Sequence, residues 1–311
     1  MTQAATSAAV FKSKAREALS DPALQQAMDR AKGGFVGARR IVVEDLAEFD
    51  SLRDTARDIK DHVLNHLDLY LERYERKTIE NGGHVHWAQT AEEACQIVKK
   101  ICLDADARLV AKGKSMVSEE MELNRVLEEA GIEVAETDLG EYIIQLAGEL
   151  PSHIIAPAIH KTREQITELF YENHSSHGFS ERVTRREAIV NEARSVLRSV
   201  FARADVGITG ANFLIAESGA NVIVTNEGNG DLSSTLPPVQ IITAGIEKVI
   251  PSLDDLSTFL RILGRSATGQ EMSAYTTLYS GPRREEEIEG PSEYHVVLLD
   301  NGRSAMLAGD Y

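Results

Sequence analysis

Short apolar runs alternate with helical patterns through the middle of the chain, and this alternation limits the possible folds more than any other feature. Strands joined through helices run parallel, because each crossover returns the chain to the same edge of the sheet. We therefore expect an α/β fold with a Rossmann-like, mostly parallel sheet and helices on both faces. In chain order the sequence predicts strands at 84–88, 108–111, 132–135 and 154–155, and helices at 91–103, 118–130, 140–147 and 162–171.

The second half of the chain continues the pattern with more strands and fewer helices. We expect Ser118 to cap the helix that stops at Gly131. Glycine-rich turns separate the strands that follow. These strands are predicted at 206–209, 220–225, 239–243, 274–279 and 293–299, with helices at 184–203 and 253–263.

The first 80 residues look helical and polar. Apolar residues at helical intervals predict a helix pair within 11–31, which stops at Gly33-Gly34, and a long amphipathic helix over 47–77. The last residues, 305–311, are too few to form a stable isolated helix. We therefore divide the chain into a helical N-terminal extension packed on the core (1–80), an α/β domain (81–303) and a truncated linker (304–311).

Composition and charge exclude several classes of partner. The formal charge of −16 repels phosphate backbones, so we expect no nucleic acid partner. No apolar run is long enough to cross a bilayer and no secretory signal is visible, so we expect a cytoplasmic protein without membrane insertion. Cys95 and Cys102, seven residues apart on a predicted helix, are too distant for a disulfide and too few for an iron–sulfur cluster.

Glycines and carboxylates gather in segments that follow predicted strands. Such loops are where open α/β sheets bind ligands, and their glycines allow the backbone to approach a ligand closely. A partly buried Glu217 or Glu227 could act as a nucleophile or general base, whereas in the alternative interpretation both only cap backbone amides. The binding candidates in these loops are Gly210, Asn226, Gly228 and Asn229.

Two further loops carry charged side chains. Lys112-Gly113-Lys114-Ser115, between a strand and a helix, is a candidate anion site, although it is not a Walker A motif. In the segment 136–141, Asp138 and Glu141 fit a capping box better than a cation site. His160-Lys161 follows a short predicted strand at the same rim.

The other patterns in the sequence argue against a metal site, a nicotinamide cofactor and a common hydrolase. His153, His160, His174 and His177 lack zinc-ligand spacing, so no metal site is expected. Neither a Gly-x-Gly-x-x-Gly fingerprint nor a Gly-x-Ser-x-Gly elbow is present, which argues against a nicotinamide cofactor and a common hydrolase.

Two long blocks, residues 112–166 and 207–255, resemble the LUD domain of the lactate-utilisation protein B family, and the likeness runs from about the first helix to Gly302. The resemblance implies a fold like the NagB/RpiA/CoA-transferase group. It also implies a role, with partner subunits, in oxidising L-lactate to pyruvate through iron–sulfur clusters. Family members continue into a ferredoxin-like domain that carries 4Fe–4S clusters. That domain is absent here, so we expect no cofactor in this chain and no redox activity from it alone.

The resemblance also assigns a pocket for a small carboxylate or anion. Pro238 and Gln240 depart from the basic residue and the histidine expected there. Two other functions remain open: a stand-alone CoA-transferase or isomerase-like enzyme that uses a strand-end glutamate, and a non-catalytic assembly domain. The pocket residues carried over are Lys112, Lys114, Ser115, Glu136, Asp138, His160, Lys161, Glu217, Asn226, Glu227, Asn229, Glu247 and Lys248.

Overall fold

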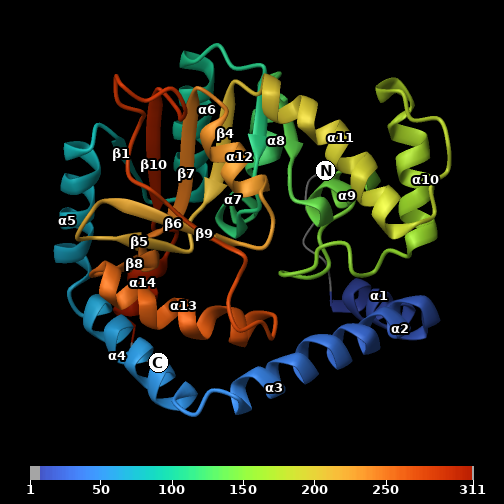
Figure 1. The fold of residues 1–311 in the computed structure, drawn as a ribbon, viewed down its shortest axis with the longest axis horizontal. Helices are drawn as coiled ribbons and strands as arrows, with labels where there is room; N and C mark the ends of the chain where they lie inside the picture. Colours follow the sequence, from blue (N-terminus) through green and yellow to red (C-terminus); the bar gives the residue numbers. More distant parts are fainter. Residues whose placement is uncertain (1–7, 310–311) are drawn as a thin grey trace.

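The computed structural model describes residues 8–309, and its centre is a six-stranded parallel sheet (Figure 1). Every neighbouring pair of strands in this sheet runs parallel, which confirms the predicted α/β class. Residues 1–7 of the predicted extension and 310–311 of the predicted linker lie outside the described residues. Across the sheet the strands are β1 (His84–Ala88), β10 (Glu293–Leu299), β7 (Val239–Gly245), β4 (Val206–Gly210), β2 (Leu109–Lys112) and β3 (Glu133–Glu136).

Helices cover one face of this sheet. Successive side chains of a strand point to opposite faces, so Val110 packs into the core on this side while Leu109 and Ala111 pack on the other. The covering helices are α6 (Ala91–Asp104), α7 (Met116–Glu120) and α8 (Leu123–Glu129).

The opposite face is covered by two different layers. Three helices cover the β2 and β3 end: α9 (Leu139–Ala147), α10 (Arg163–Asn173) and α11 (Arg186–Arg203). A second sheet, together with α5 (Leu67–Glu80), covers β7 and β10. Its strands are, in order, β8 (Val249–Ile250), β5 (Phe213–Ile215), β6 (Ala220–Thr225) and β9 (Tyr275–Tyr279).

Two helices pack on the far side of the second sheet. They are α4 (Phe49–Leu64) and α13 (Leu253–Ala267), which share a core with Phe213 and Ile215. The N-terminal helices extend from α4 as an arm along the bottom of Figure 1. The arm and the remaining short helices are α1 (Ala8–Ser20), α2 (Pro22–Ala31), α3 (Gly37–Glu44), α12 (Asn229–Thr235), α14 (Arg303–Leu307) and the turns η1 (Lys32–Val36), η2 (Ser175–His177) and η3 (Ile246–Lys248).

Two predicted boundaries in the N-terminal region are wrong. Gly33-Gly34 does not end the helix, because the π-turn η1 passes through it and leads into α3. The predicted helix at 47–77 is two helices, α4 and α5, with the break at Asn65-His66. Apolar spacing continues across this break, so the pattern gives no sign of it.

Three predictions nearer the sheet also need correction. The helix at 118–130 is divided into α7 and α8 by Glu122, whose φ is +52°, and Ser115 rather than Ser118 is the cap. Residues 154–155 form bends and no strand. The end of the chain forms the short helix α14, which is held to the core by Arg303 and Glu120 at 2.8 Å. None of the helices in residues 8–309 has the length and apolar character needed to cross a membrane.

The order of the strands creates a switch point between β2 and β4. The chain leaves β2 towards β3 on one side, while after β4 it goes to β7 on the other side. The connections that follow β2 and β4 therefore lead to opposite sides of the sheet. In open parallel sheets, a crevice at the carboxyl ends of two such strands is the usual ligand site.

Gly207 of β4 provides a test of how α12 packs on the sheet. A Cβ atom at this position would lie 1.7 Å from the carbonyl oxygen of Ser233, so α12 can pack here only against glycine. We expect Gly207→Ala to lower the free energy of unfolding by about 3 kcal/mol or more, since the backbone must move. Urea denaturation measures this loss.

Gly34→Ala is the matched control, because a Cβ atom on this residue would have nothing within 4 Å and the residue is exposed in η1. We expect it to keep or slightly raise stability, as alanine favours helix over glycine. Equal stability of the two variants would contradict the packing described for α12.

Candidate functional site

A pocket of about 370 Å³ lies at the carboxyl edge of the parallel sheet, at the switch point between β2 and β4. Loops from both sheets form its walls, so segments far apart in the sequence meet here. Its volume falls within the range of small-molecule sites. The lining residues are Gly113, Lys114, Ser115, Met116, Val117, Asp138, Ile154, Ile155, Thr209, Gly210, Ala211, Asn212, Ile223, Val224, Thr225, Asn229, Gly230, Thr243 and Lys248.

The loops after β2 and β4 pack closely against each other. A Cβ atom on Gly210 would lie 3.1 Å from the Ser115 Oγ atom, so glycine allows this approach. Ser115 Oγ accepts a hydrogen bond from the Ser118 backbone N–H at 3.2 Å and lies 3.1 Å from Thr243 Oγ1. Ser115 therefore lines the pocket while it holds the start of α7 in place.

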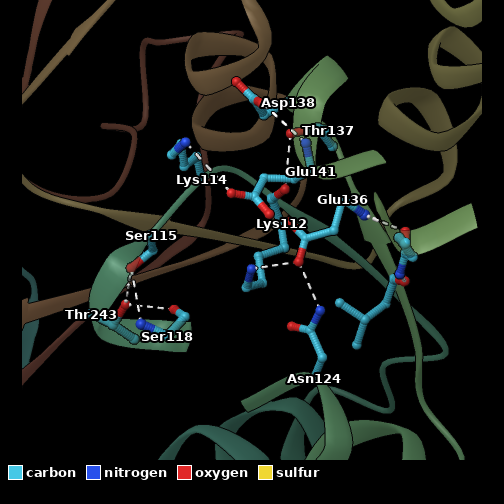
Figure 2. A network of polar contacts seen from close by, with 12 residues as sticks. Lys112, Lys114, Ser115, Ser118, Asn124, Glu136, Thr137, Asp138, Glu141 and Thr243 are labelled. Carbon is cyan, nitrogen blue, oxygen red and sulfur yellow. Dashed lines mark hydrogen bonds and ion pairs between the residues drawn. The ribbon is translucent and has the colours of Figure 1, made fainter. Parts of the chain in front are cut away.

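A buried ion pair stands beside the pocket at the ends of β2 and β3. Lys112 and Glu136 are direct partners in the parallel register, and Lys112 Nζ donates to Glu136 Oε1 at 2.6 Å. Asn124 of α8 donates to the same oxygen at 2.7 Å (Figure 2). Both charged side chains are almost fully buried and neither lines the pocket. Their role is to join the two strands.

Lys114, two residues further along, does face the pocket. Its ammonium group lies 3.5 Å from Glu141 Oε1, and Figure 2 shows the two side chains facing each other. Among the described residues the Lys114 Nζ atom has no hydrogen-bond partner. A buried cation without a hydrogen-bond acceptor is unfavourable unless an anion is supplied. Lys114 is therefore the best placed cation for a bound anion.

Glu141, which the sequence assigns to a capping box, instead contacts the pocket residue Lys114, although it does not line the pocket itself. The pKa of its carboxyl group is raised to about 7, first by burial and then by the charges of Glu119 and Glu136, while the charge of Lys114 opposes them. At neutral pH this group can therefore both give and take a proton. The Asp138 cap is confirmed, with Oδ1 accepting from the Gly140 and Glu141 amides, but Glu141 faces Lys114 and does not complete a capping box.

Glu227 is close to two residues that line the pocket, Lys114 and Asp138, although it does not line the pocket itself. Partial burial raises the pKa of its carboxyl group, the nearby charge of Asp138 raises it further, and Lys114 lowers it. The side chain still reaches solvent. The structure thus brings Glu227 together with Lys114 and Asp138, as the sequence predicts.

Other predicted residues lie away from the pocket. Glu217 follows β5 at the end remote from the pocket, where Oε2 accepts from the Leu253 backbone N–H at 3.2 Å, next to Ser252, which caps α13. The expectation that Glu217 shares one cleft with Lys114 and Glu227 is therefore wrong. It rests on the order of the segments, which does not show that β5 belongs to a second sheet.

The remaining candidates have structural partners. His160 and Lys161 both bind the carboxylate of Glu149, with His160 Nε2 at 2.8 Å from it. The Glu247 carboxylate forms an ion pair with Arg303 Nε at 2.7 Å. Its neighbour Lys248 lines the pocket.

Among the glycine-rich loop candidates, the structure separates those at the pocket from those beside it. Gly210 and Asn229 line the pocket, and Gly228 precedes the first turn of α12. Asn226 instead binds Gln270 and the Ala274 backbone N–H, which ties the end of β6 to the loop after α13.

The two cysteines do not fit an iron–sulfur cluster. Cys95 and Cys102 are both buried free thiols on α6, and burial raises the pKa of Cys95 to about 11 and of Cys102 to about 12. Such thiols stay protonated, whereas a 4Fe–4S cluster needs four thiolates. As their side chains stand, residues 8–309 hold no group of three or more His, Cys, Asp or Glu arranged around a metal ion.

Known proteins resemble this chain over most of its length. A family model described as the LUD domain matches residues 71–299. A lactate utilization protein B from Bacillus velezensis is 43% identical over 304 residues, covering 97% of this chain and 63% of that protein. An uncharacterized electron transport protein, YkgF, from Escherichia coli is 40% identical and covers 98% of this chain and 64% of that protein.

The chain spans about 63% of the length of these relatives. A solved structure of a DUF162 family protein from Deinococcus radiodurans aligns with 75% of this chain and 98% of its own, at 15% identity and a TM-score of 0.39. That score is too low to add to the fold described above.

The Lys112–Glu136 pair predicts a strong asymmetry between single and double substitutions. Glu136→Gln leaves Lys112 charged in a buried site, so we expect unfolding free energy to fall by about 3 kcal/mol at pH 7. Lys112→Met with Glu136→Gln removes both charges and should cost less than the single change. Urea denaturation of the three proteins tests this, and a single variant as stable as the unchanged chain would contradict it.

The raised pKa of Glu141 predicts a stability that depends on pH. Between its usual pKa of 4.5 and the folded value of about 7, the folded state binds more protons than the unfolded state. Stability therefore falls as pH rises through this range and levels off above it. Relative to Glu141→Gln, we expect the unchanged chain to lose about 1–2 kcal/mol from pH 5 to pH 8.

Denaturation curves at several pH values measure this difference. Glu149→Gln serves as the control, since its carboxylate lies outside the pocket and its pKa is lowered, first by Lys161. A constant gap between Glu141→Gln and the unchanged chain at every pH would show that Glu141 does not titrate as described.

Proposed function

The chain belongs to the LUD domain family, which confirms the resemblance seen in its sequence, and we propose that it serves lactate utilisation by binding a small carboxylate at the carboxyl edge of its sheet. The observation that carries this proposal is the buried Lys114 ammonium, which faces the pocket without a hydrogen-bond acceptor among the described residues. A carboxylate would supply the missing acceptor and charge.

The chemistry of the pocket suits a 2-hydroxy or 2-oxo acid. Lys114 and Lys248 supply positive charge for the carboxylate. The Thr209 hydroxyl is buried without a hydrogen-bond partner in the described structure, and Asn212 also lines the pocket. These polar groups can orient the oxygen on the second carbon, while Ile154 and other apolar side chains take the methyl group.

Proton transfer in this proposal belongs to Glu141 and Glu227. Oxidation of L-lactate to pyruvate removes two electrons and two protons, one proton from the hydroxyl group and one from the C–H bond of the second carbon, and the electrons leave to the acceptor described below. Both carboxyl groups lie near Lys114 and have raised pKa values, and the pKa of Glu141, at about 7, suits it to accept a proton near neutral pH. Glu217 has no part in this step because it lies at the remote end of β5.

The residues of this pocket cannot accept the two electrons. Iron–sulfur clusters accept electrons one at a time, and the buried thiols of Cys95 and Cys102 do not fit one. We propose that partner subunits, or a further part of a longer protein, carry the clusters. The described domain then holds the substrate and docks to that carrier.

Ligand-dependent melting tests this function. A ligand that binds only the folded state raises the melting temperature, so L-lactate or pyruvate should raise it for the unchanged chain. We expect Lys114→Met to reduce this rise, because one charge-assisted bond is lost. The apparent affinity for the acid should fall at least about tenfold.

Lys161→Met is the matched control, since Lys161 is a lysine paired with Glu149 outside the pocket. It should respond to lactate like the unchanged chain. The proposal fails if neither acid shifts melting of the unchanged chain, or if Lys114→Met responds fully.

A further inference from the structure

Arg303 lies where the chain leaves β10 and starts the short helix α14. Its side chain is half-buried, whereas the other four residues of α14 are exposed. Arg303 is therefore the residue through which α14 packs on the body of the molecule. The arginine is not among the residues that line the pocket, but its partners belong to elements that do.

The guanidinium group of Arg303 joins two elements of the pocket wall. Its Nη2 and Nη1 atoms donate to the two carboxylate oxygens of Glu120 at 2.8 Å and 3.1 Å, and Nε lies 2.7 Å from Glu247 Oε2. Glu120 ends α7, whose first residue, Met116, lines the pocket. Glu247 belongs to η3 and precedes Lys248, which also lines it. A planar guanidinium with donors in a fixed fork suits such a bridge between two carboxylates.

Gly245, at the end of β7, makes room for this bridge. A Cβ atom on Gly245 would lie 2.6 Å from Arg303 Nε and still closer to Glu247 Oε2. The ion pair therefore lies directly over the backbone of β7, at the edge of the sheet where the pocket opens. Any larger residue at this position would displace the pair.

Glu247 has two cationic neighbours that compete for one carboxylate. Its Oε2 atom lies 2.7 Å from Arg303 Nε, while Oε1 lies 3.5 Å from Lys248 Nζ. Because attraction between charges falls with distance, the shorter contact to Arg303 holds the carboxylate more strongly. The Lys248 ammonium, which is only partly buried, is therefore left with positive charge for an anion in the pocket.

We propose that Arg303 is a positioning residue for the carboxylate site, which keeps the Glu247 carboxylate from closing on Lys248 and so leaves Lys248 able to bind the anion. This inference rests on the proposed function, since it concerns the same pocket. Arg303 acts only through Glu247 and touches no ligand. Without the arginine, the Glu247 carboxylate turns to Lys248 and neutralises it, and the affinity for an anion falls.

Binding of L-lactate to the full chain, followed by the rise in melting temperature with lactate concentration, tests this role. Arg303→Gln should weaken the apparent affinity about three- to tenfold. Adding Glu247→Gln to this variant should restore the affinity, because no carboxylate then remains to neutralise Lys248. Adding Glu120→Gln instead should restore nothing, although it removes the same charge. The two double variants thus separate the position of the carboxylate from net charge.

Arg182→Gln is the matched control, because Arg182 forms an ion pair with Glu168 at 2.7 Å outside the pocket. It should bind lactate like the unchanged chain. Lactate binding that Arg303→Gln leaves intact, or that Glu120→Gln restores as well as Glu247→Gln does, overturns the inference and leaves the proposed function standing.

A measurement without lactate distinguishes failure of this inference from failure of the proposed function. In the lactate-free chain, the losses of stability caused by Glu120→Gln and Glu247→Gln should be non-additive, because both residues share Arg303. In the Arg303→Gln background the same two losses should add. Losses that add in both backgrounds would show that Glu120 and Glu247 act independently, which overturns the bridge whether or not lactate binds.

Discussion

Parallel pairing of six strands is the constraint on which the rest of the structure depends. Because every strand of the central sheet runs in the same direction, the carboxyl ends of all six strands lie at one edge of the sheet. The loops after β2, β3, β4 and β7 therefore meet, although their residues are spread over a long stretch of the sequence. The reversal of direction between β2 and β4 opens the crevice that these loops surround.

Burial then sets the electrostatics of this edge. Lys112 and Glu136 neutralise each other where their strands pair, so they stabilise the frame and are not available to a ligand. Lys114 lies one step further along the loop, with only a longer contact to Glu141. The buried carboxyl group of Glu141 beside this lysine is close to its protonation midpoint at neutral pH, which suits a site that binds an anion and moves a proton. The alternation along Lys112-Gly113-Lys114 thus separates a structural charge from a functional one.

Much of this can be predicted from the sequence, and the failures have physical causes. Most strands and helices and the loop at Lys114 follow from local periodicity and from glycine positions, and the structure has them there. The second sheet leaves no such signal, because β5 has three residues and pairs with strands that include the distant β8. As a result the pattern places Glu217 in the wrong region. It also assigns Glu141 to a capping box, since burial of a helix residue against a neighbouring loop leaves no local trace.

The most direct measurement of the central claim is the amide NMR spectrum of the labelled chain during titration with L-lactate. Binding at the carboxyl edge predicts shift changes that saturate and concentrate at Gly113, Ala211 and Asn229, which surround the pocket. Saturable changes confined to other surfaces, such as the groove between α6 and α8 lined by Glu92 and Arg125, would contradict the account.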